Sequence, residues 1–263
     1  PPEAAGRRAG KQGIMDINDT FGEIVSARQR LVAWLVHGFT AAGAVLALLC
    51  LDAINRGSFR YALWLMGAAI VVDASDGSLA RRVHIKVAAP QIDGALLDNM
   101  IDYVNYVIVP AFFMIAADML PPGWRFFGAM LVVLVSAYQF SQVDAKTEDH
   151  FFKGFPSYWN IVVLYLYLWD TPPWTNLAFI IVLALLVFVP VKYVYPSQLE
   201  FLTRNRILRR AMLIATLIWG AATAGLLWIY PQTDGVLRFL SVGYIFLYAG
   251  VSLYRTLVPL KDD

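Results

Sequence analysis

The sequence predicts an all-α, polytopic membrane protein with about eight transmembrane helices. Of its 263 residues, 59% are hydrophobic and only 15% are charged, and the mean hydropathy is +0.59. A soluble domain is usually about 45–50% apolar. Apolar runs long enough to cross about 30 Å of hydrocarbon recur along the chain. Together these observations exclude an ordinary soluble domain.

Eight apolar runs account for the expected helices. They are residues 31–51, 59–72, 94–117, 126–142, 156–169, 174–193, 211–230 and 236–254. Pro110 is expected to kink the third run, and the fifth is short unless its start is tilted or buried. Residues 192–210 form a basic linker that can hold a short interfacial helix. We expect residues 1–25 to be a cytosolic lead-in and residues 26–263 to be a single transmembrane domain.

Loop charge predicts the orientation of these helices. If both termini are cytosolic, only four of the 21 basic residues lie in the opposite loops, namely Arg56, Arg60, Arg125 and Arg238. The positive-inside rule therefore favours an even number of spans, with the loop after residue 72 on the cytosolic side. The net charge of +2 does not suggest a nucleic-acid partner. A single cysteine, Cys50, excludes a disulfide within the chain.

Four aspartates lie in or beside segments that otherwise resemble membrane spans, where an uncompensated charge costs roughly 2.5–3.5 kcal/mol. On a helix, Asp73 and Asp76 fall within roughly 60° of one face, and Asp98 and Asp102 within roughly 40°. If the two helices run side by side, the carboxylates converge on one pocket and stay ionised only around a cation. All-oxygen ligands suit Mg²⁺ or Mn²⁺. Two such ions in one site would stabilise the attacking and leaving oxygens of an in-line displacement at phosphorus.

The aspartates belong to a longer motif, Asp-x-x-Asp-Gly-x-x-Ala-Arg followed by Gly-x-x-x-Asp-x-x-x-Asp. Its defined positions are Asp73, Asp76, Gly77, Ala80, Arg81, Gly94, Asp98 and Asp102. This order resembles the signature of the CDP-alcohol phosphotransferase family and fills it without a substitution. The resemblance implies a six-helix core and covers nearly all of the chain after about Ser26. Segments 97–104 and 152–160 resemble the bacterial phosphatidylcholine synthase branch of that family.

The resemblance implies an activity and a place in the cell. The expected reaction is transfer of a phosphatidyl group from CDP-diacylglycerol to choline, giving phosphatidylcholine and CMP. The expected enzyme is a homodimer in the bacterial inner membrane, with its active site facing the cytosol. Serine, inositol or glycerol 3-phosphate are alternative acceptors within the same family. A cation transporter and an intramembrane prenyltransferase are alternatives outside it.

The resemblance also implies roles for the motif residues. Asp73, Asp76 and Asp98 would hold one divalent cation, Mn²⁺ or Mg²⁺. A second cation would share Asp73 and Asp98 with Asp102, which would also be the general base. The expected nucleotide-binding residues are Asp76, Gly77, Ala80, Arg81 and Gly94, with His37 and Thr40 from the first span. Plainer interpretations stay open: the glycines as close-packing sites, Arg81 as an interfacial anchor, and His37 as a packing residue.

The acceptor site depends on residues outside the motif. Proteins hold a quaternary ammonium in aromatic cages that nearby carboxylates assist. The candidate acceptor-binding residues are Tyr103, Tyr106, Tyr138, Glu148, Phe151, Phe152, Phe155, Tyr158 and Trp159. An aromatic belt at the membrane interface would by itself place Tyr and Trp at several of these positions.

Overall fold

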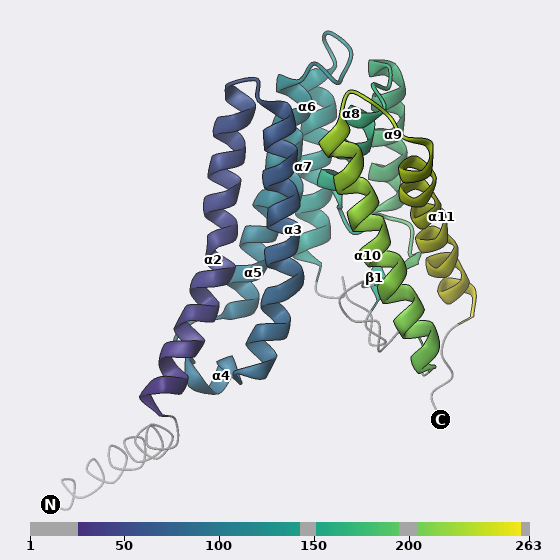
Figure 1. Cartoon of the computed structure of the whole chain (residues 1–263). Helices are drawn as coiled ribbons and strands as arrows, with labels where there is room; N and C mark the ends of the chain where they lie inside the picture. Colours follow the sequence, from purple (N-terminus) through teal and green to yellow (C-terminus); the bar gives the residue numbers. More distant parts are fainter. Residues whose placement is uncertain (1–25, 143–150, 195–202, 204, 259–263) are drawn as a thin grey trace, which may run out of the picture.

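Long apolar helices run up and down through the computed structural model, which describes residues 26–142, 151–194, 203 and 205–258. The first half contains α2 (Ala27–Asn55), α3 (Phe59–Arg82), α4 (Ile85–Ala88), α5 (Gly94–Tyr103), the π-helical turn η1 (Val104–Ile108), α6 (Val109–Ala116) and α7 (Arg125–Ser141). The second half contains β1 (Phe152–Lys153), α8 (Trp159–Leu168), α9 (Pro173–Leu186), β2 (Lys192–Tyr193), α10 (Arg206–Ile229) and α11 (Gly235–Leu257). Figure 1 shows α2 and α3 on one side of the bundle and α10 and α11 on the other.

The predicted fold class is confirmed, because every predicted span corresponds to an apolar helix in the expected order. Within the described part of the chain, five units are long and apolar enough to cross a membrane: α2, α3, the unit Gly94–Ala116, α10 and α11. The helices α7, α8 and α9 are apolar but shorter. The start of α2 and the end of α11 lie at the same end of the bundle (Figure 1), as an even number of passages requires. The chain is therefore a multi-pass membrane protein.

The predicted end of the sixth span is wrong. Helix α9 ends at Leu186, not near residue 193. Pro190 follows shortly, and its ring prevents the helix from continuing because it removes an N–H donor and clashes with the preceding turn. Residues 192–193 instead form β2, which pairs antiparallel with β1 so that Phe152 lies opposite Tyr193. Two-residue strands are too short to show alternation in the sequence, so this ribbon was not predicted.

The helix ends that flank the aspartate motif have local causes. Ser26 caps α2 through a capping box with Gln29, whose backbone N–H donates to Ser26 Oγ at 3.2 Å. Gly57, at φ +70°, allows the tight turn from α2 into α3. The carboxylate of Asp93 accepts from the N–H groups of Ala95 and Leu96 and begins α5. Asp93 thus has a capping role that distinguishes it from the motif aspartates.

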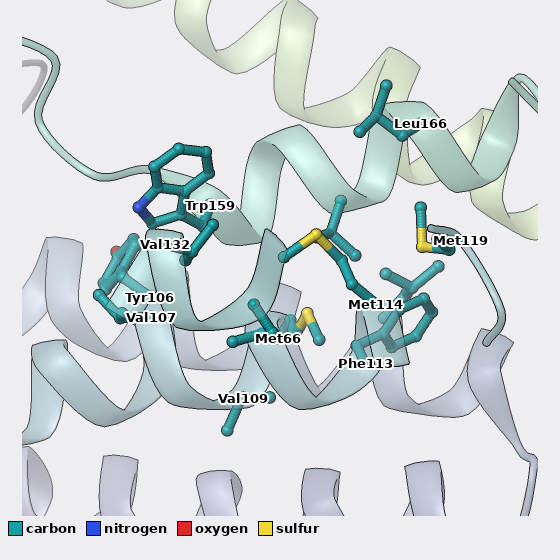
Figure 2. Packing of buried hydrophobic residues seen from close by; sticks show 14 of the residues in the cluster. Met66, Tyr106, Val107, Val109, Phe113, Met114, Met119, Val132, Trp159 and Leu166 are labelled. Carbon is teal, nitrogen blue, oxygen red and sulfur yellow. The ribbon is translucent and has the colours of Figure 1, made fainter. Parts of the chain in front are cut away.

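The apolar core lies among α2, α3, η1, α6, α7, α8 and α9, and it includes Leu226 and Leu227 of α10. Figure 2 shows Trp159 and Tyr106 toward one end of this cluster and Phe113 with Met119 toward the other. Close packing of this kind stabilises helix association within lipid, where the hydrophobic effect between helices is weak. The predicted lead-in, Glu148 and residues 195–202 and 204 of the basic linker lie outside the described residues, and residues 206–210 of that linker belong to α10.

Candidate active site

The four motif aspartates meet at one cavity, as their helical spacing predicts. Helix α3 stays helical to Arg82 and carries the first pair, while α5 carries the second. Carboxylate oxygens of Asp73, Asp98 and Asp102 lie within 4.8 Å of one another. Asp76 lines the same cavity and is 6% exposed. Three oxygen donors at this separation, with a fourth beside them, fit a hard divalent cation.

Helix α2 closes the cavity through a close approach that the sequence analysis missed. A Cβ on Gly43 would lie 2.7 Å from Cγ2 of Ile101, so only glycine permits this contact. Asn105, 6% exposed, donates from Nδ2 to the carbonyl of Gly43 at 3.0 Å. Both Gly43 and Asn105 line the cavity. An asparagine inside an apolar run, together with a small residue on another span, was the available signal.

The π-helical turn η1 directs a tyrosine at the metal-ligand candidates. Tyr106 lies within η1, and its hydroxyl donates to Oδ2 of Asp73 at 2.7 Å. A π-turn contains an extra residue relative to an α-helix and is frequent at functional sites. Tyr106 was predicted as an acceptor-binding residue through its ring, and this hydroxyl contact was not predicted. The bond fixes the orientation of the Asp73 carboxylate, as hydrogen bonds to ligand groups commonly do in metal sites.

Two polar residues of α2, Thr40 and His37, lie beside the two halves of the motif. Thr40 and Asp76 both line the cavity, and the Thr40 hydroxyl donates to the Val36 carbonyl at 3.4 Å. A Cβ on Gly94 would lie 3.1 Å from Cε1 of His37, so the absence of a side chain on Gly94 lets the imidazole approach α5. His37 is 5% exposed, and its Nε2 has no hydrogen-bond partner among the described residues. His37 is not among the residues that line the cavity.

The remaining motif residues lie on the last turns of α3. Arg81 is exposed, and its Nη2 donates to the Ser78 hydroxyl at 3.3 Å. Its Nη1 would lie 3.4 Å from a Cβ on Gly77. Ala80 is half-buried in the same turn. These residues flank the aspartates from the end of α3, and Arg81 does not line the cavity itself.

Three of the candidate aromatic residues form a series that reaches the aspartates. The ring centroids of Tyr106 and Tyr158 are 6.0 Å apart. Phe152 lies beyond Tyr158, with 6.2 Å between ring centroids in an edge-to-face arrangement. The three rings therefore form a continuous series that ends at the hydroxyl contact with Asp73.

Among the described aromatic candidates, Tyr106 alone lines the cavity itself. Tyr103 donates its hydroxyl to the carbonyl of Val133 at 3.0 Å, and Tyr138 is 50% exposed. Phe155 is buried in the core, and Phe151 belongs to a separate small cluster beside α11. Trp159 is fully buried, and its Nε1 donates to the hydroxyl of Ser136 at 2.7 Å. These contacts assign packing roles to most of the aromatic segment.

Comparison with known proteins agrees with this geometry. Residues 33–191 match the CDP-alcohol phosphatidyltransferase family. A protein named phosphatidylcholine synthase from Legionella pneumophila is 46% identical over 233 residues, which cover 88% of this chain and 91% of the relative. Proteins of the same name from Legionella bozemanae and Pseudomonas aeruginosa are 49% and 34% identical, over 82% and 85% of this chain and 100% and 92% of their own lengths. The chain therefore belongs to the CDP-alcohol phosphatidyltransferase family of membrane enzymes.

Proposed function

We propose that the protein transfers the phosphatidyl group of CDP-diacylglycerol to choline, forming phosphatidylcholine and releasing CMP. The observation that carries this proposal is the convergence of Asp73, Asp98 and Asp102 within 4.8 Å at the family motif. The choice of choline is supported by the names of relatives that match most of this chain. It is supported further by the aromatic rings beside Asp73.

The family depends on divalent metal, and the aspartate cluster has the donor chemistry to bind it. We assign Asp73, Asp76, Asp98 and Asp102 to two cations, Mg²⁺ or Mn²⁺, because carboxylate oxygens suit both ions. When bound, such cations supply positive charge that stabilises the phosphoryl oxygens and the leaving group. The Tyr106 hydroxyl keeps Asp73 oriented toward the cluster.

Asp102 is the proposed general base. It accepts the hydroxyl proton of choline while the choline oxygen forms a bond to the phosphorus that carries diacylglycerol. The bond from that phosphorus to the CMP oxygen breaks, and CMP leaves with the bonding electrons. No covalent intermediate with the protein is needed.

The nucleotide is proposed to lie between α2 and the two halves of the motif. His37 offers a buried Nε2, and Thr40 lines the cavity beside Asp76. Gly77 and Gly94 leave the backbone accessible, as a close approach by a pyrophosphate or base requires. At the exposed end of α3, Ala80 leaves space beside Arg81, whose guanidinium can bind a phosphate with two parallel hydrogen bonds.

The choline ammonium is proposed to contact Tyr106 and Tyr158, with Phe152 behind them. Aromatic faces attract a quaternary ammonium without hydrogen bonds. The two tyrosines lie next to Asp73, so an ammonium held there keeps the choline hydroxyl near the reacting phosphorus. The geometry favours these rings over Tyr103, Tyr138, Phe155 and Trp159 as acceptor ligands.

The active site is proposed to face the cytosol of a bacterium, from the inner membrane. The distribution of basic residues supports this orientation. Three basic residues predicted to lie on the far side have partners in the structure: Arg56 contacts Asp52 at 2.9 Å, Arg125 contacts Asp118 at 2.5 Å, and Arg60 donates to carbonyls of Trp228 and Tyr230. We propose a homodimer from the family resemblance, which cross-linking in native membranes would test.

The test is CMP release by the purified protein in lipid vesicles containing CDP-diacylglycerol. Choline and either Mn²⁺ or Mg²⁺ should be required together, and a chelator should abolish release. Serine, inositol and glycerol 3-phosphate should give little CMP. Release driven by one of these alcohols and not by choline would contradict the proposed acceptor. Uptake of a cation without any CMP release would contradict the enzymatic proposal and favour a transporter.

A further inference from the structure

Helix α11 holds strand β2 by a set of side-chain to backbone hydrogen bonds. The backbone N–H of Lys192 donates to Thr256 Oγ1 at 2.8 Å, and that of Val194 donates to Ser252 Oγ at 3.2 Å. The Tyr248 hydroxyl donates to the Val194 carbonyl at 2.9 Å. Ser252 is 1% exposed. Because these groups are one or two turns apart on α11, one helix face satisfies alternate residues along the outer edge of β2.

The opposite edge of β2 holds the segment that leads into α8. Lys153 pairs with Lys192, the Gly154 N–H donates to the Val191 carbonyl at 2.9 Å, and the Phe155 N–H donates to the Leu186 carbonyl at 3.0 Å. Gly154 has φ +79°, and a Cβ there would lie 2.1 Å from the Val187 carbonyl oxygen. The backbone of residues 152–155 is thus fixed against residues 186–193.

The fixed segment carries the outer part of the proposed acceptor site. Phe152, in β1, packs edge to face against Tyr158. Tyr158 contacts Tyr106, which is bonded to Asp73. A shift of β1 would therefore move Phe152 and Tyr158 relative to the ammonium position. The aspartates lie on other elements, α3 and α5.

The family match ends at Val191, and β2 begins at the next residue. By contrast, the match to the Legionella pneumophila relative covers 233 residues of this chain. Whichever residue that match starts at, it must extend well beyond Val191. The part from Lys192 onward, containing β2, α10 and α11, is called the C-terminal unit below. Strand β2 and helix α10 therefore lie within the match to that relative and outside the family-wide match.

We propose that the C-terminal unit positions the acceptor segment, residues 151–158, and that Ser252 and Thr256 are its positioning residues. The inference rests on the proposed function, and it assigns the unit to acceptor binding. In this proposal the C-terminal unit makes no contribution to metal binding or to the chemical step. The hydroxyls act through β2 and β1 and do not touch the substrate.

The test compares Ser252→Ala and Thr256→Val with the wild type in the CMP-release assay. Loss of one such hydrogen bond should raise the KM for choline roughly three- to tenfold, with kcat and the KM for CDP-diacylglycerol unchanged. Ser252→Thr and Thr256→Ser keep the hydroxyl and should restore the wild-type KM. If Ser252→Ala gives no folded protein, Tyr248→Phe, which removes only the hydroxyl bonded to Val194, replaces it.

Ser241→Ala is the matched control. Ser241 also lies on α11 and is fully buried, but it bonds Tyr165 and Thr223 and makes no contact with the ribbon. It should lower thermal stability without moving the KM for choline. An equal KM change in Ser241→Ala, or a joint change of kcat and both KM values in Ser252→Ala, would overturn the inference. The wild-type assay tests the proposed function separately, and if another alcohol is the acceptor, the same variants are compared with that alcohol.

Discussion

Two of the polar clusters among the described residues of this bundle differ in kind. The aspartate cluster consists of Asp73, Asp76, Asp98 and Asp102 around one cavity. The hydroxyl network consists of Tyr165, Thr223, Ser241 and Trp219, which join α8, α10 and α11. In it Tyr165 bonds Ser241 at 2.5 Å, Thr223 bonds Ser241 at 2.7 Å, and Trp219 Nε1 donates to the Tyr165 hydroxyl at 2.7 Å.

The two clusters distinguish buried polar groups that serve a reaction from those that join helices in a membrane protein. Neutral hydroxyl and indole groups satisfy one another, and such bonds between helices contribute only modestly to stability. Carboxylates gathered in one place repel one another and cost much more to keep within a bilayer. A protein keeps the first kind of cluster to join helices. It keeps the second kind where a cation and a reaction need it.

The largest expected effect comes from Asp102→Asn. Loss of the general base should lower kcat for CMP release by roughly 10²–10⁴-fold. Thermal stability in detergent should stay the same or rise, because one of several like charges is removed. Nearly intact turnover in this variant would remove the chemical role assigned to the aspartate cluster.

Tyr106→Phe should have the next largest effect. It removes the hydroxyl bonded to Asp73 and keeps the ring that faces Tyr158. Loss of a hydrogen bond to a metal ligand typically costs about 10–100-fold in metal affinity or activity. Titrating CMP release with Mn²⁺ should therefore show a higher metal requirement, while the KM for choline stays unchanged. A change in the KM for choline alone would show that the hydroxyl serves the acceptor and not the metal ligand.

Tyr158→Leu should raise the KM for choline and leave the metal requirement unchanged. A cation–π contact contributes about 0.5–2 kcal/mol, which corresponds to roughly a two- to thirtyfold change in KM. Tyr138→Leu is the control, because Tyr138 is half exposed and packs against Phe188. Equal effects of the two substitutions would contradict the assignment of the ammonium site to Tyr158.

Tyr165→Phe should have the smallest effect on activity. It removes the hydroxyl at the centre of the hydroxyl network, and bonds of this type between membrane helices contribute about 0.6–1.7 kcal/mol. The unfolding temperature in detergent should fall, while kcat and both KM values per folded molecule stay at the wild-type level. A loss of kcat in the folded variant would erase the distinction between the two clusters.

The sequence predicted the features that depend on a recurring apolar pattern or on the spacing of residues within one helix. Spacing alone placed Asp73 with Asp76 and Asp98 with Asp102, and the cavity confirms that the two pairs meet. Spacing along a single helix could not predict the contacts between helices. The approach of Gly43 to Ile101 depends on how α2 crosses α5, which no local pattern encodes.

The ribbon and the π-turn were missed for different physical reasons. The strands β1 and β2 comprise two residues each, and their pairing depends on the end of α9 and on hydroxyls from α11. The π-turn gives no change in composition, because its residues are as apolar as their neighbours apart from Asn105 and Tyr106. The role of the Tyr106 hydroxyl follows from that turn, so it was missed as well.

The π-turn η1 also sets how the first half of the third span is rotated about the helix axis relative to the second half. It joins α5, which carries Asp98 and Asp102, to α6, which packs in the core around Phe113. Deleting one residue between Asp102 and Pro110 would return the segment to a regular α-helix and rotate one half against the other by about 100°. Either the aspartates would leave the cavity or Phe113 would leave the core. The chain length across this stretch is therefore as constrained as the identity of the aspartates, and proteins that share the site should show no insertion or deletion there.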